Sequence, residues 1–87
     1  MTTLYKRNAQ GKPLVWSAEE VVNHTPNGRV TYIVINYGLV GGTLHRETIN
    51  ITKKNVNELQ SRINAKRKEG YKELSELKDS GISEFIL

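Results

Sequence analysis

Arg29–Tyr37 carries the sequence RVTYIVINY, and this stretch decides the fold class. β-Branched and aromatic residues dominate it, and such residues favour extended strands. Because alternate residues of a strand point to opposite faces, one face would carry Val30, Tyr32 and Val34, and the other Thr31, Ile33 and Ile35. Both sets are largely apolar. The stretch is therefore predicted to be a central strand, covered on its flanks by other strands.

A tight hairpin turn is predicted immediately before this strand, at His24–Gly28 (HTPNG). Asn27 and Gly28 both tolerate the positive φ that primed turns require. The preceding segment, Pro13–Asn23, is interpreted as the partner strand, although its part Ser17–Val22 would also tolerate a helical turn.

The N-terminal segment Thr2–Asn8 is typical of an edge strand, and the polar turn Ala9–Lys12 would join it to the next strand. On the other side of the central strand, Gly38–Gly42 contains three glycines, and Thr43–Ile51 resumes an alternating pattern. A second hairpin is predicted there. The glycines do not form a P-loop, because that motif needs Lys followed by Ser or Thr at a helix start.

A helix is predicted from Asn55 to Glu69. Asn55 would be the N-cap, with Glu58 three residues later as in a capping box. The apolar face would consist of Val56, Leu59 and Ile63. Gly70 is suited to a left-handed residue after the helix.

The chain beyond the helix is predicted to return to the sheet at Tyr71 and to form a short helix at Leu74–Leu77. The expected fold is α+β: a twisted antiparallel sheet of about four strands, with one main C-terminal helix packed on one face. Residues 1–79 would form one domain, and residues 80–87 an apolar tail.

Composition narrows the functional classes. The chain has 87 residues, a formal net charge of +4, no cysteine and two histidines. Disulfides and thiolate metal sites are excluded, and a histidine metal site is not expected. No apolar run is long enough for a membrane span, and the N-terminus does not match a signal peptide. We expect a cytoplasmic protein without a metal or other cofactor.

Catalytic motifs are not apparent in the sequence. The histidines and acidic residues show no spacing that would place a base beside a nucleophile. We therefore expect no enzymatic activity from these residues, although they could be a subdomain of a larger enzyme.

Basic residues are concentrated between Lys53 and Lys72, and acidic residues follow them. Two interpretations are open. The cluster Arg62–Lys68 can be a solvated helix end that suits the helix dipole. Alternatively, with Lys53 and Lys54, it can hold a phosphate backbone, because each neutralised phosphate releases a counterion.

The segment Tyr37-Gly38-Leu39-Val40-Gly41 resembles the Trp-Gly-Arg-Val-Gly signature of WGR domains, with Tyr37 in place of Trp and Leu39 in place of Arg. The later Lys66-Arg67-Lys68-Glu69-Gly70-Tyr71 is similar to the Lys-rich helix and Gly-Tyr ending of many bacterial and phage members. The opening Leu4-Tyr5-Lys6-Arg7, with Gly11-Lys12 and Trp16, is similar to segments at the N-terminus of phage ATP-dependent DNA ligases.

This resemblance implies a non-catalytic DNA-binding accessory module, as in a phage DNA ligase or a repair protein, that engages duplex backbone. The family's aromatic contact carries over to Tyr37, but Leu39 cannot donate to a phosphate. For both Tyr37 and Trp16, the alternative is a place in the core. The predicted nucleic-acid contacts are Tyr37, Arg46, Lys53, Lys54, Arg62, Lys66 and Lys68.

A different class of function stays open on the sequence alone. The apolar tail Ile82–Leu87 could dock this domain to a larger enzyme or a phage assembly. In that case the partner would be a protein instead of duplex DNA.

Overall fold

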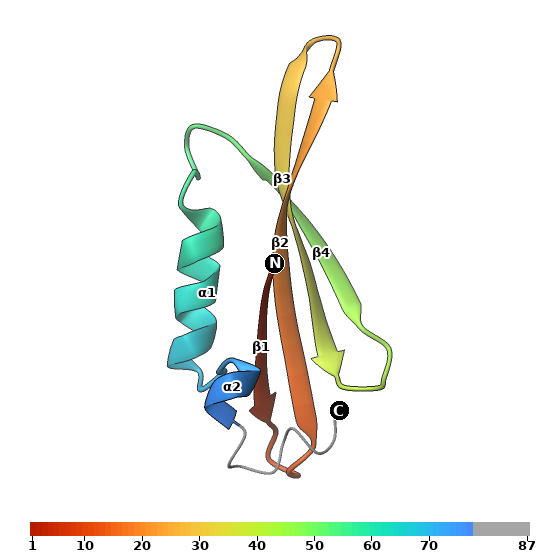
Figure 1. The fold of residues 1–87 in the computed structure, drawn as a ribbon, viewed down its shortest axis with the longest axis vertical. Coiled ribbons are helices and arrows are strands. Elements are labelled where there is room, and N and C mark those ends of the chain that lie inside the picture. Colours follow the sequence, from red (N-terminus) through yellow and green to blue (C-terminus); the bar gives the residue numbers. More distant parts are fainter. Residues whose placement is uncertain (78–87) are drawn as a thin grey trace.

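The computed structural model describes residues 1–77 and shows a small α+β fold built on one four-stranded antiparallel sheet (Figure 1). Each strand pairs with the next along the chain, so the strand order is β1-β2-β3-β4. The strands are β1 (Thr2–Arg7), β2 (Pro13–Thr25), β3 (Gly28–Leu39) and β4 (His45–Ile51), and the helices are α1 (Glu58–Lys68) and α2 (Leu74–Leu77). The predicted fold class, and a central position for Arg29–Tyr37, are confirmed.

The core lies on the face of the sheet beside α1. Buried side chains come from three adjacent strands and occupy facing register positions: Leu4 of β1 pairs with Trp16 of β2, and Ala18 of β2 pairs with Ile35 of β3. Leu59 and Ile63 of α1 are partly buried and pack against this cluster. Trp16 is 3% exposed, so the interpretation of this residue as part of the core is confirmed.

β2 and β3 extend beyond their neighbours as a two-stranded ribbon (Figure 1). β1 pairs with β2 only as far as Ala18, and β4 pairs with β3 only as far as Thr31. We call residues 23–30 the hairpin arm. Its turn differs from the prediction: Gly28 has φ +126°, but Asn27 does not have positive φ, so the turn is not of the primed type with two left-handed residues.

The start of α1 also differs from the prediction. The helix begins at Glu58, and the cap position is occupied by Asn57 without a side-chain capping bond. Asn55 instead closes the turn after β4: its Oδ1 accepts from the Thr52 backbone N–H at 2.6 Å, and its Nδ2 donates to the Asn50 carbonyl at 2.9 Å. Val56 therefore precedes the helix, is 65% exposed and does not join the apolar face.

The end of α1 was predicted correctly. Gly70 has φ +102°, its N–H bonds the Arg67 carbonyl, and the Tyr71 N–H bonds the Lys66 carbonyl. This is the Schellman arrangement of a helix C-terminus. Tyr71 packs against the core, and the backbone of Lys72 then pairs with that of Tyr5 on the edge of β1. The predicted tail, residues 80–87, lies outside the described residues.

Candidate nucleic-acid interface

A cleft of about 260 Å³ lies between α1 and the sheet, and it brings together residues far apart in the sequence. Arg62 and Lys66 enter it from α1, where a spacing of four residues places them on the same side of the helix. The lining residues, which define the cleft throughout, are Trp16, Ile35, Tyr37, Glu47, Arg62 and Lys66. Three of the predicted contacts, one aromatic and two basic, thus lie at one place.

Tyr37 is 41% exposed, so it is not a closed part of the core. It faces His45 directly across the β3–β4 register. The two rings stack with centroids 5.3 Å apart and an interplanar angle of 29°. The sheet therefore presents an accessible aromatic pair beside the basic residues of α1.

The basic residues of the cleft have acidic partners. Arg62 Nε donates to Glu58 at 2.8 Å, and its Nη1 lies 3.7 Å from Glu47. The hydrogen bond to Glu58 is the main cause that raises the pKa of Arg62 above its ordinary value, so the guanidinium stays charged. Lys66 pairs with Glu69 at 3.3 Å and lies over the Tyr71 ring, 5.5 Å from its centroid. Lys66 is therefore not a freely solvated charge at the helix end, because Glu69 and Tyr71 contact it.

The remaining predicted contacts do not join the cleft. Lys68 is exposed and forms no ion pair within residues 1–77. Arg46 follows His45 by one position on β4, so strand alternation points it to the opposite face of the sheet from Tyr37. The structure therefore separates Arg46 from the basic side chains of α1.

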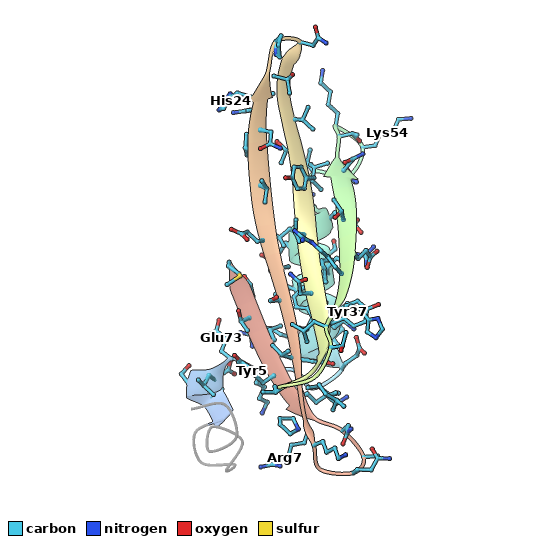
Figure 2. The ribbon with its side chains drawn as sticks, turned by 90° about the vertical axis from the view of Figure 1, so that its right-hand side faces the viewer. Tyr5, Arg7, His24, Tyr37, Lys54 and Glu73 are labelled. Atoms are coloured by element: carbon cyan, nitrogen blue, oxygen red, sulfur yellow. The ribbon has the colours of Figure 1, made fainter. Side chains whose placement is uncertain are left out.

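Lys53 and Lys54 lie at the end of the sheet from which the hairpin arm projects. Figure 2 shows His24 and Lys54 toward that end, well away from Tyr37. A groove of about 580 Å³, which we call the tip groove, lies there beside β3. Its lining residues are Arg29, Val30, Thr31, Asn50, Ile51, Thr52, Lys53 and Val56.

Arg29 was not among the predicted contacts. In the sequence it is simply the first residue of the best strand pattern. The signal that could have identified it is strand length: β4 is shorter than β3, and its last residue, Ile51, pairs with Thr31. The turn that carries Lys53 must then begin beside Arg29.

The glycine of the Tyr37-Gly38-Leu39 segment has a steric role. Gly38 has φ +151°, and a Cβ there would lie 3.0 Å from the Thr43 carbonyl oxygen and 3.3 Å from a methyl carbon of Leu44. Both contacts are made by the connection to β4. The close approach of this loop requires glycine at position 38.

Other kinds of site were sought in residues 1–77. No cluster of three or more histidine, cysteine or acidic side chains that could hold a metal ion occurs in this part of the chain. Within the same residues, neither helix has the length and apolar character needed to cross a membrane.

Comparisons with protein-family models, with curated proteins and with solved structures found no match. The resemblance to WGR domains therefore stays a prediction that rests on the residues quoted for it.

Proposed function

We propose that this chain is a non-catalytic DNA-binding module of the WGR-like kind, which engages duplex backbone through basic residues. The observation that carries the proposal is the convergence of Tyr37, Arg62 and Lys66 in one cleft. Tyr37 comes from the signature-like segment, and the two basic residues come from the Lys-rich helix. These features are distant in the sequence, so their meeting in the fold is independent support for a common surface.

The cleft suits a phosphodiester for a chemical reason. Arg62 and Lys66 supply positive charge and N–H donors, and the Tyr37–His45 stack offers a flat aromatic surface to an adjoining sugar. The acidic partners do not prevent this, because exposed ion pairs contribute only about 0–1 kcal/mol and a phosphate can replace a carboxylate. Lys68 follows Lys66 by two positions, which is about 200° around α1, so it would add positive charge from the side of the helix away from the cleft.

The cellular context of the proposal comes from the resemblance. The module would act as an accessory part of a phage DNA ligase or a repair protein, and the chemistry would reside in other residues. The absence of cysteine fits a reducing compartment, for which we propose the cytoplasm.

Fluorescence anisotropy with a labelled 20-base-pair duplex, at several salt concentrations, tests the proposal. We expect a Kd of about 1 µM or weaker at low salt. The slope of log K against log salt should be roughly −3 to −5 if about four to six phosphates are neutralised. No binding at 50 mM salt, or an affinity indifferent to salt, would refute this proposal and favour a protein partner.

A further inference from the structure

The hairpin arm is narrow and exposed on both sides. Neither β1 nor β4 extends along residues 23–30, so the arm consists of two strands with no neighbouring strand in the described chain. Residues 23–30 are all exposed. The turn itself, Thr25–Gly28, contains small side chains and no aromatic residue, whereas the energetic centres of protein interfaces are typically Trp, Tyr and Arg.

Charge at this end of the molecule has one sign. Segments 21–31 and 48–57, which form the arm, its base and the turn after β4, contain Arg29, Lys53 and Lys54. Every glutamate in residues 1–77 lies outside these two segments. Most basic residues of α1 are different, because Arg62, Lys66 and Arg67 have carboxylate partners.

The basic side chains at this end share one side of the sheet. Arg29 pairs with His24 across the arm, and strand alternation places both on the same face as Thr31 and Ile33. Arg29 and Lys53 line the tip groove together. A polyanion laid against this face would meet both side chains.

We propose that the hairpin arm enters a groove of duplex DNA while Arg29, Lys53 and Lys54 hold the flanking phosphates. The inference rests on the proposed DNA-binding function and adds a second contact to the cleft. Two strands about 4.8 Å apart form a ribbon that the major groove, about 12 Å wide, admits. The phosphates on either side of the groove would then lie beside the base of the ribbon, where the protein carries positive charge.

The two contacts define the extent of the complex. The longest dimension of the molecule is 48 Å. At about 3.4 Å of duplex per base pair, this length corresponds to about 14 base pairs, which is the upper limit on the duplex that one domain with both contacts engaged would cover. A domain that uses the cleft alone would cover fewer.

Two sets of variants test the arm. The first is Arg29→Glu with Lys53→Glu, and its control is Lys12→Glu with Lys72→Glu, which changes the net charge equally at exposed positions outside the arm and the cleft. The second replaces residues 23–30 with Asn-Gly, which joins the paired residues Val22 and Thr31 through a two-residue hairpin turn. Circular dichroism and thermal melting establish that each variant is folded.

We expect the arm variants to weaken binding of the labelled duplex about tenfold or more, and the control pair to weaken it threefold or less. Because the chain has no cysteine, Asn27→Cys also gives a unique attachment point for an iron chelate. Hydroxyl-radical cleavage from that point should fall in the groove of the duplex that the arm occupies. A variant without the arm that binds DNA as tightly as the wild type would overturn this inference and leave the proposed function standing. A wild-type protein that binds poly-glutamate through the arm and no DNA would overturn both.

Discussion

The rings of Tyr37 and His45 stack across the β3–β4 pair, with 5.3 Å between their centroids. Cross-strand pairs that include an aromatic ring stabilise sheets by about 0.2–1 kcal/mol. In a double-mutant cycle, Tyr37→Ala and His45→Ala should therefore show a coupling of about 0.5 kcal/mol in urea unfolding. The control cycle combines Tyr37→Ala with His24→Ala on the hairpin arm, and its two effects should add. Equal coupling in both cycles would show that the stack contributes nothing specific.

Gly38→Ala should destabilise the domain by about 2 kcal/mol, because it combines a left-handed backbone with a close contact to the loop before β4. Gly11→Ala is the matched control: Gly11 also has positive φ, +77°, but a Cβ there meets nothing within 4 Å. Its cost should be nearer 1 kcal/mol, from backbone conformation alone. Urea unfolding measures the loss of stability in both variants. Equal losses would mean that the loop before β4 moves aside for the added methyl group without a measurable cost in stability.

Core truncations should follow the burial that the structure shows. Ile63→Ala should cost about 1–2 kcal/mol, less than a fully buried isoleucine would, because this side chain is only partly buried beside the core. Ile33 is 0% exposed, and Ile33→Val alone should cost about 1 kcal/mol. A loss at Ile63 of 4 kcal/mol or more would indicate that α1 is packed more closely than its partial burial implies.

Acid should weaken the contact that the Glu76 carboxylate of α2 makes with Arg67 of α1. The Glu73 backbone N–H donates to the Glu76 carboxylate at 3.2 Å, and the Arg67 guanidinium donates to it at 3.1 Å. The first bond and then the second lower the pKa of Glu76 below its ordinary 4.5. A lowered pKa means that this stabilisation is present above pH 4.5 and is lost as the pH falls through the lower value.

A carbon-detected NMR titration of the Glu76 carboxyl group should give a midpoint below that of glutamate in a short peptide. Arg67→Gln should move the midpoint only part of the way back, because the backbone bond from Glu73, the largest single cause, remains. Complete reversal by Arg67→Gln would assign the whole effect to the ion pair.

Local sequence signals predicted the parts of the fold that depend on neighbouring residues. The strand pattern of Arg29–Tyr37 and the glycine after α1 are of this kind, and both were predicted correctly. The N-cap was not, because Asn55 has two competing uses. Its side chain can cap a helix or close the turn after β4, and the backbone groups of Asn50 and Thr52 that decide the outcome are brought to it by the tertiary fold.

The candidate site was predictable as a set of residue types but not as an arrangement. Charge along the chain identified Lys53, Lys54, Arg62 and Lys66 as one basic group. The register of the sheet places Lys53 and Lys54 away from the cleft, because the turn that carries them follows Ile51, which pairs with Thr31. Thr31 and Tyr37 are six positions apart on β3, or roughly 20 Å at 3.3 Å per residue. Of the partners of Lys66, Glu69 stands at the helical i, i+3 spacing and was open to prediction, whereas Tyr71 is brought to Lys66 by the turn after α1.

Coupling between substitutions distinguishes a cleft that acts as a unit from charges that act separately. Tyr37 and Lys66 line the same cleft, so a bound phosphate and its sugar would contact both. Tyr37→Ala and Lys66→Gln should each weaken binding of the labelled duplex about threefold to tenfold, and the double variant should lose less than the product of the two. Lys66→Gln is preferable to a charge reversal, because a glutamate there would repel Glu69, which lies 3.3 Å from the Lys66 ammonium.

The matched cycle combines Tyr37→Ala with Lys53→Gln, which removes the same charge at the tip groove. Effects at sites more than about 10 Å apart with no shared partner usually add within about 0.5 kcal/mol, so this double variant should lose the full product. Anisotropy titrations of the wild type and the five variants at one salt concentration provide both cycles. Additivity in both cycles would mean that Tyr37 and Lys66 contact DNA independently or not at all, and the cleft would lose its role as the centre of the interface.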